Sequence, residues 1–296
     1  MEKIKTVNSL SGGKTSSYIA ANYKADYNVF ALVRTNDKKC LFPDHKIRQQ
    51  VSDRLGTEFI GTLEDNMIIY TMLDLEQYIG QKIDWVTGKT FDEIIKKKTV
   101  FNDKGEPKVF LPQSNRRYCT TELKLEPIKK YWLDNINEVC DMRIGFRANE
   151  MRRAKTMIEK LNKEGLQSDK FIVGKYKNGN NKWELKDWRI PSFPLITDGI
   201  FKDKIEKYWN NKPVKFAWVN NCVGCMGASA FYIKHQYSKN QNKIQWFIDQ
   251  EKKSLKDYKR AWRIDGLTYE QIISHNSQIK LFDDDFNECD SGYCGV

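Results

Sequence analysis

The chain has 296 residues, of which 40% are hydrophobic and 30% are charged. This composition excludes a disordered chain, and the length is sufficient to bury a full core without disulfides or metals. The sequence contains neither an apolar run of about 20 residues, which a membrane span needs, nor an apolar leader after Met1. We therefore expect a cytoplasmic protein with no membrane partner.

The formal net charge of +11 favours polyanionic partners such as nucleotides and nucleic acids. Because the charge is spread along the chain, a generally lysine-rich composition explains it equally well. The chain has seven cysteines, an odd number. Inside the cell this favours metal binding or thiol chemistry over a disulfide framework.

Strand and helix patterns alternate along the first half of the chain. Hydrophobic periodicity predicts strands at 4–10, 29–35, 58–62 and 142–145, with helices at 15–24, 43–55 and 122–135. Such alternation indicates βαβ units. The expected fold is α/β, with a doubly wound, mainly parallel, Rossmann-like sheet.

The second half changes character. An Asn-Gly pair within 174–187 indicates a β-hairpin between two arms that carry aromatic residues. From about residue 235, charged amphipathic helices replace the sheet pattern, and they could serve for dimerisation into an oligomer. We therefore expect a nucleotide-binding domain at 1–230 and a helical, Cys-bearing C-terminal region at 231–296.

A phosphate-binding loop is predicted between the first strand and the first helix, at Ser11, Gly12, Gly13, Lys14, Thr15 and Ser16. Backbone N–H groups and the helix dipole can hold an anion there, and the glycines permit close approach. Lys14 adds a positive charge. A Walker A loop does not fit, because that pattern requires glycine where Asn8 stands. The alternative is a plain strand-to-helix turn.

This loop resembles the Ser-Gly-Gly-x-Asp-Ser/Thr signature of PP-loop ATP pyrophosphatases, with Thr15 in place of the aspartate. Three later segments resemble the phosphoadenosine phosphosulfate (PAPS) reductase family of that superfamily, in the same order: 116–127, 144–154 and 191–200. The resemblance spans about residues 4–230. It implies an adenine nucleotide alpha hydrolase-like fold that binds ATP, adenylyl sulfate or PAPS.

Basic residues of these segments are candidates to bind the anionic nucleotide: Arg116, Arg117, Lys124, Arg147 and Arg153. Arginine and lysine can clamp phosphate or sulfate oxygens. The segment from residue 144 leaves the carboxyl end of a strand, where open α/β sheets bind ligands. Glu150 could cap the helix that follows. The alternative for Arg116 and Arg117 is an ordinary solvated face.

The cysteines suggest a metal site. Cys222 and Cys225 form a C-x-x-C motif, which suits a metal clip or a redox pair. In the iron–sulfur branch of the resembled family, Cys119, Cys222 and Cys225 match three ligands of a [4Fe–4S] cluster, and Tyr118 replaces the fourth. Cys294 is a candidate replacement ligand, and zinc is the alternative metal.

The C-terminal tail also resembles the Glu-Cys-Gly motif of the reductases, whose thiol attacks the sulfonucleotide sulfur. The resemblance implies Cys289 as this nucleophile and Cys294 as a resolving thiol or a metal ligand. A basic pocket would favour the thiolate form. The candidate catalytic residues are therefore Cys289, Cys294 and Lys14 of the phosphate loop.

Three functions are consistent with the sequence. The first is a PAPS-reductase-like oxidoreductase, in which the tail thiol attacks the sulfonucleotide and a thioredoxin-like donor releases sulfite. The second is an ATP-dependent sulfurtransferase that inserts sulfur into DNA or tRNA with a Cys-bound cluster. An expected basic and aromatic surface favours it, with Trp183, Trp188, Tyr208 and Trp209. The third is a non-catalytic nucleotide-sensing or nucleic-acid-binding module, which would bind nucleotide without turnover.

Overall fold

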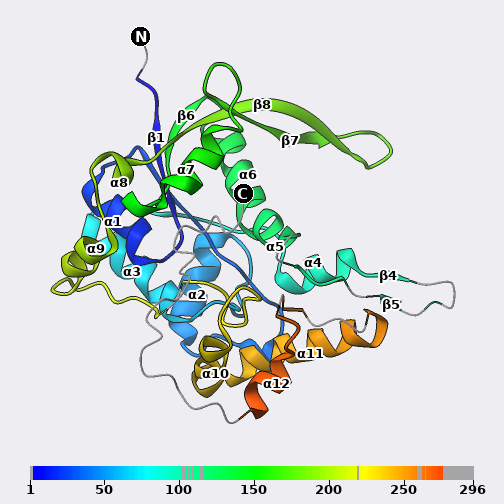
Figure 1. Cartoon of the computed structure of the whole chain (residues 1–296). Coiled ribbons are helices and arrows are strands. Elements are labelled where there is room, and N and C mark those ends of the chain that lie inside the picture. Colours follow the sequence, from blue (N-terminus) through cyan, green and yellow to red (C-terminus); the bar gives the residue numbers. More distant parts are fainter. Residues whose placement is uncertain are drawn as a thin grey trace.

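The protein is described by a computed structural model that covers residues 3–275 except 102–104, 106, 109, 114–115, 219, 259–261 and 264. Its centre is a six-stranded sheet in the order β3-β2-β1-β6-β8-β7 (Figure 1). All neighbouring strands are parallel except β7, which is antiparallel to β8. The strands are β1 (Thr6–Leu10), β2 (Tyr27–Ala31), β3 (Asp84–Val86), β6 (Cys140–Arg143), β7 (Gln167–Lys175) and β8 (Asn181–Ser192). The expected α/β class and mainly parallel sheet are confirmed.

Helices cover both faces of this sheet. Phe30 and Leu32 point into a core formed with α1 (Lys14–Asn22), α2 (His45–Leu55), α3 (Met67–Ile79) and α9 (Lys202–Trp209). Val29 and Ala31 point the other way and pack with α6 (Glu126–Asn135). This division follows from the alternation of side chains along a strand. None of the described helices is both long and apolar enough to cross a membrane.

A third core joins the C-terminal helices to the rest of the protein. It contains side chains of α10 (Ala230–Lys239), α11 (Gln241–Tyr258), α12 (Tyr269–Ser274) and α4 (Phe91–Lys98), together with Val33 and Leu63. The remaining elements are short: β4 (Val100–Phe101), β5 (Pro107–Lys108), α5 (Tyr118–Thr120), a π-helical turn (Thr121–Leu125), α7 (Met151–Ile158), α8 (Pro194–Thr197) and single 3-10 turns at Lys38–Cys40 and Ala148–Glu150.

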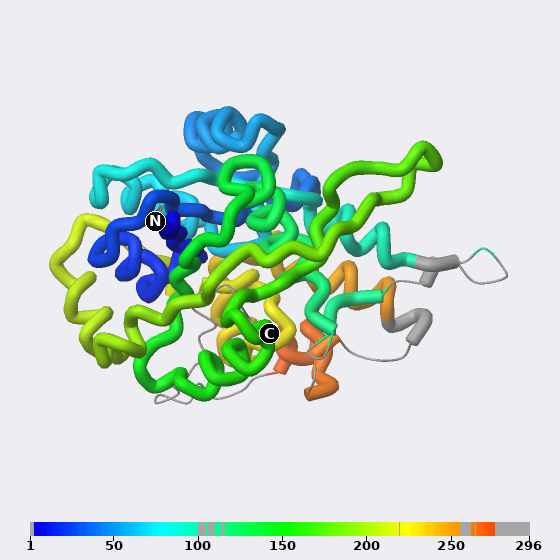
Figure 2. The backbone as a smooth tube through the Cα atoms, turned by 90° about the horizontal axis from the view of Figure 1, so that it is seen from above, coloured from blue at the N-terminus to red at the C-terminus, as the bar shows by residue number. Residues whose placement is uncertain are grey.

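The predicted hairpin is present as the β7–β8 arm, which projects from the body of the molecule (Figure 2). At its tip, the Gly179 N–H donates to the Tyr176 carbonyl at 2.9 Å. At its base, Phe171 and Trp188 pack against Trp132 of α6. The arm is therefore anchored at one end by aromatic packing.

The strand predicted at 58–62 is not formed, and this prediction was wrong. Gly61 makes only isolated bridges, to Thr35 and Leu41, and the third strand of the sheet is β3 instead. The segment is pressed against residues 40–42, since a Cβ at Gly61 would lie 1.9 Å from the Cys40 carbonyl oxygen. Phe59 is fully buried without sheet pairing, which explains the misleading apolar pattern.

Candidate functional site

The predicted phosphate loop lies at the point where the strand order reverses. From β1 the chain adds β2 and β3 on one side, and later β6 and β8 on the other (Figure 1). In open α/β sheets, ligands bind outside the carboxyl ends of the strands at such a point. Residues 11–13 leave β1 there and α1 begins at Lys14, so the loop occupies the general ligand position of this fold class.

Gly12 is required by both conformation and space. Its φ of +82° is in the left-handed region, and a Cβ would lie 2.5 Å from Ile68 Cγ2. The loop hydroxyls bond to one another, since Ser11 Oγ lies 3.0 Å from Ser16 Oγ. Ser16 Oγ also donates to the Gly13 carbonyl at 3.2 Å. The loop is therefore a defined, compact turn into the N-terminus of α1.

Lys14 is the one residue of this loop that reaches toward solvent. Its side chain is 43% exposed, and its Nζ is 3.9 Å from Glu206 Oε1 on α9. Lys202 lies at the same distance from that carboxylate, so two ammonium groups share it. Trp209 Nε1 donates to the Lys14 carbonyl at 3.0 Å, which fixes α9 over the start of α1. The result is a positive charge at the helix N-terminus.

The phosphate loop is tied directly to the C-x-x-C segment. Asn220 is buried, and its Nδ2 donates to Ser11 Oγ at 2.8 Å. Two residues later, Cys222 forms an isolated bridge with Glu64, and the Val223 N–H donates to the Leu63 carbonyl at 2.9 Å. The loop after β1 and the C-x-x-C turn are therefore adjacent.

Three of the predicted metal ligands line a single cavity. Cys119, Cys222 and Cys225 surround a space of about 60 Å³, together with Arg117 and Lys124. The three thiols come from two segments about 100 residues apart in the sequence. Within the described part of the chain, no three His, Cys, Asp or Glu side chains are positioned to hold a metal ion. The structure thus brings the cysteines together around a small cavity without a finished metal-binding geometry.

The cavity is half-buried, as are its three cysteines, and Arg117 and Lys124 lie in its lining. Burial, with the nearby Cys225, raises the pKa of Cys119 to about 11. Burial and Glu64 likewise raise the pKa of Cys222 well above its usual value. Lys124 Nζ pairs with Glu64 Oε1 at 2.8 Å. Glu64 Oε2 and Arg117 Nε are buried and have no hydrogen-bond partner among the described residues, which is uncommon in a folded protein.

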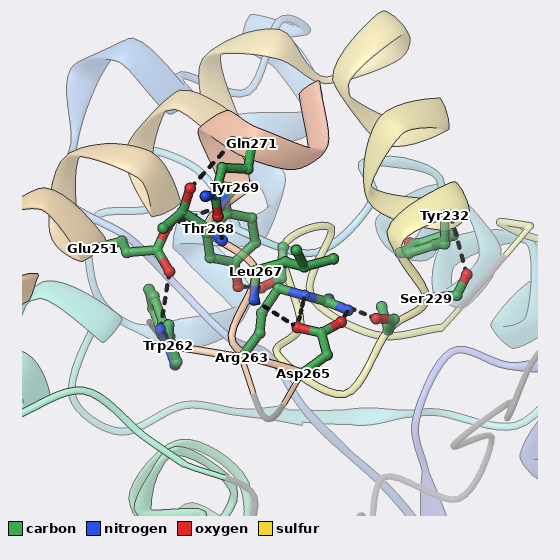
Figure 3. A network of polar contacts seen from close by, with 12 residues as sticks. Ser229, Tyr232, Glu251, Trp262, Arg263, Asp265, Leu267, Thr268, Tyr269 and Gln271 are labelled. Atoms are coloured by element: carbon green, nitrogen blue, oxygen red, sulfur yellow. Dashed lines mark hydrogen bonds and ion pairs between the residues drawn. The ribbon is translucent and has the colours of Figure 1, made fainter. Parts of the chain in front are cut away.

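The C-terminal helices hold the C-x-x-C turn in place. Tyr269 donates its hydroxyl to the Gly224 carbonyl at 2.6 Å, between the two cysteines. Glu251 of α11 accepts the N–H groups of Trp262 and Tyr269 at 2.9 and 2.8 Å (Figure 3). Arg263 pairs with Asp265 and donates to the Ala228 carbonyl at 2.6 Å. Sequence reasoning missed these supporting residues, since nothing in their spacing marks a contact with the motif.

Glu150 holds both Arg147 and Arg153, in the segment that follows β6. The Glu150 carboxylate is 3.1 Å from Arg147 Nε and 2.5 Å from Arg153 Nη1. It also accepts the Arg147 N–H at 2.9 Å, which is the predicted capping role. A Cβ at Gly145 would lie 3.4 Å from Thr15 Cγ2, so this segment adjoins the loop.

The other predicted residues are distributed differently. Arg116 is exposed, while Arg117 and Lys124 line the cysteine cavity. Cys289 and Cys294 lie outside the described residues. The expected aromatic surface was wrong for two of its four members, because Trp188 and Trp209 are 1% and 4% exposed and pack in the core. Tyr208 is partly buried, and Trp183 is 49% exposed.

Comparisons of the chain with protein-family models, with curated proteins and with solved structures find no match.

Proposed function

We propose that this chain is a PP-loop enzyme, related to the PAPS reductases, that uses an adenine nucleotide in sulfur chemistry. One observation carries the proposal: the hydrogen bond from Asn220 to Ser11 joins the phosphate loop to the segment that carries Cys222. A nucleotide bound at the first would lie beside a cysteine cavity at the second. Activation of a group by a nucleotide and transfer of sulfur or electrons need this proximity.

The loop is suited to anions. It precedes the N-terminus of α1, where the helix dipole favours bound phosphate or sulfate. Lys14 adds positive charge, and Thr15 contributes no carboxylate to offset it. We therefore propose that the loop binds the phosphates of ATP, adenylyl sulfate or PAPS, with Lys14 as a charge that stabilises the leaving group.

The cysteine cavity supplies the donor chemistry of an iron–sulfur cluster, three cysteine sulfurs, which would have to shift to bind it. Cys119, Cys222 and Cys225 would hold the cluster, which would supply electrons or sulfur. Lys124 and Arg117 at the cavity wall would offset the negative charge of the thiolates. Metal binding would also displace the protons that burial holds on Cys119 and Cys222.

The test is anaerobic purification of the full chain, followed by iron and acid-labile sulfide analysis and nucleotide-binding calorimetry. We expect an absorbance band near ~400 nm that Cys222→Ser removes. Cys140→Ala is the matched control, because Cys140 is buried but bonds to the Trp188 carbonyl, away from the cavity. We expect Gly12→Ala to abolish nucleotide binding, since both its φ and Ile68 oppose a Cβ. A protein that binds neither iron, zinc nor nucleotide would contradict the proposal.

The same preparations separate the two proposed reactions. Release of sulfite from adenylyl sulfate or PAPS with a thioredoxin-like donor, lost in Cys289→Ser, would identify a reductase. Sulfur incorporation into DNA or tRNA that requires ATP and Cys222 would identify a sulfurtransferase. Nucleotide binding without either reaction would support the non-catalytic alternative.

A further inference from the structure

A second and larger cavity, of about 720 Å³, lies between the β7–β8 arm, α6, residues 87–89 before α4 and Lys97 near the C-terminal end of α4. We call it the arm groove. Its apolar wall includes Phe171, Ile172 and Trp183 from the arm, and its basic lining includes Lys89, Lys97 and Lys175. In Figure 1 the arm extends from the body of the molecule past α6.

Positive charge is in excess at one end of this groove. The single carboxylate of Glu122 is approached by Lys89 at 2.9 Å, Lys97 at 3.4 Å and Lys98 at 3.8 Å. Three ammonium groups therefore share one carboxylate. The Lys89 ammonium, with burial, lowers the pKa of Lys97, as expected for crowded like charges. An anionic ligand would relieve this crowding.

The apolar wall offers an exposed ring. Trp183 is 49% exposed and Ile172 is 40% exposed, although both line the groove. Their strands are held from below by Phe171 and Trp188, which pack on Trp132. A rigid aromatic platform next to lysines is the combination that binds single-stranded nucleic acid, because bases stack on the ring and phosphates meet the ammonium groups. An acidic protein would use the charges but would not need the exposed ring.

The groove also shares a wall with the cysteine cavity. Thr121 and Glu122 line the groove, and the preceding Cys119 and Thr120 line the cavity. All four belong to the continuous turn from α5 into the π-helical segment. A strand lying in the groove would therefore pass next to the segment that carries Cys119.

We propose that the arm groove binds a single strand of nucleic acid, with a base stacked on Trp183 and phosphates held by Lys89, Lys97 and Lys175. Binding of the strand does not depend on the sulfur chemistry proposed above. If that chemistry is also correct, the groove identifies nucleic acid as the substrate that receives the sulfur.

The test measures fluorescence anisotropy of labelled oligo-dT and oligo-U, about 20 nucleotides long, with the full chain between about 50 and 200 mM salt. We expect the logarithm of the affinity to fall with the logarithm of the salt concentration, with a slope of about −0.7 per neutralised phosphate. Trp183→Ala should weaken binding about 5- to 100-fold through loss of a stacked base. Lys97→Gln combined with Lys175→Gln should reduce the slope by about 1.4.

Two matched controls lie outside the groove. Tyr176 is an aromatic residue of the same arm, 56% exposed, that does not line the groove; Tyr176→Ala should leave the affinity unchanged. Lys82 is 81% exposed and precedes β3, whereas Lys89 follows β3. Lys82→Gln should leave the slope of affinity against salt concentration unchanged.

The proposal would be overturned by no binding at about 50 mM salt, by equal binding of a poly-glutamate peptide of the same charge, or by equal losses in the control variants. Tighter binding of a DNA duplex than of either single strand would also overturn it. Iron content and nucleotide binding, measured on the same variants, report on the proposed function separately, so failure of one proposal is distinguishable from failure of the other.

Discussion

Gly224 of the C-x-x-C turn is packed too closely against Phe247 to carry a larger side chain. A Cβ there would lie 2.3 Å from Phe247 Cδ2 and 2.4 Å from Cγ, inside the third core. We expect Gly224→Ala to lower the free energy of unfolding by about 1–3 kcal/mol, as overpacking of a core does. It should also reduce iron binding, because the turn must move away from α11 and carry Cys222 and Cys225 with it. Urea unfolding and iron analysis measure the two effects.

Gly174→Ala is the matched control for this substitution. A Cβ at Gly174 meets no atom within 4 Å. Its effect on the free energy of unfolding should therefore stay within about 0.5 kcal/mol. If Gly224→Ala proves as stable as the wild type, the close packing of the turn on Phe247 is refuted.

At the scale of single residues, spacing alone predicted Cys222 and Cys225 as a metal or redox site. The resemblance to the PAPS reductases added Cys119. The residues that hold the turn could not be predicted in this way. Tyr269 bonds to Gly224 across 45 residues, and a tyrosine on an amphipathic helix carries no local signal of such a contact. The same applies to Asn220, whose bond to Ser11 spans 209 residues.

At the scale of elements, some periodic segments were predicted and others were missed, among them the 13-residue helix α3 (Met67–Ile79) and the strand β3. The helix predicted at 43–55 is α2, and the hairpin at 174–187 is the β7–β8 arm. By contrast, β3 has only three residues, too few for an alternating pattern to stand out. β3 is defined by its pairing with β2, and this pairing cannot be recognised from the three residues alone.

The burial of Lys243 on α11 predicts how the stability of the protein depends on pH. Lys243 Nζ donates to the Glu64 carbonyl at 2.5 Å and to Asn66 Oδ1 at 2.7 Å. Burial nevertheless lowers the pKa of Lys243 from 10.5 to about 8. The unfolded chain therefore binds one more proton than the folded chain between these two values, and the contribution of Lys243 to stability rises with pH over that window.

We expect this contribution to disappear in Lys243→Met. Between pH 8 and 10, the wild type should gain stability relative to the variant by at most about 1.4 kcal/mol per pH unit. Urea unfolding of both proteins at three pH values across this window measures the difference. Parallel curves for the two proteins would show that Lys243 keeps its proton in the folded state.

At the scale of the whole molecule, the third core crosses the expected boundary at residue 230. Val33 and Phe91 precede the boundary and Trp246 and Phe247 follow it, yet all four are at most 3% exposed and belong to one cluster. Burial of one large apolar side chain contributes about 1.5–3 kcal/mol, and an entire domain is stable by only about 5–15 kcal/mol. Loss of several such contacts is therefore comparable to the whole stability.

We therefore expect the full chain to unfold in one cooperative transition, with near- and far-ultraviolet circular dichroism changing together. A fragment of residues 1–230 should not fold stably, because removal of α10–α12 would expose the apolar side of α4 and leave the C-x-x-C turn without Tyr269. Amide dispersion in the NMR spectrum of the fragment measures this. A well-dispersed spectrum, or two separate transitions in the full chain, would show that 1–230 is an independent domain and that the C-terminal helices only cover it. In the cooperative case, the helices are part of the site itself, because the position of Cys222 and Cys225 depends on them.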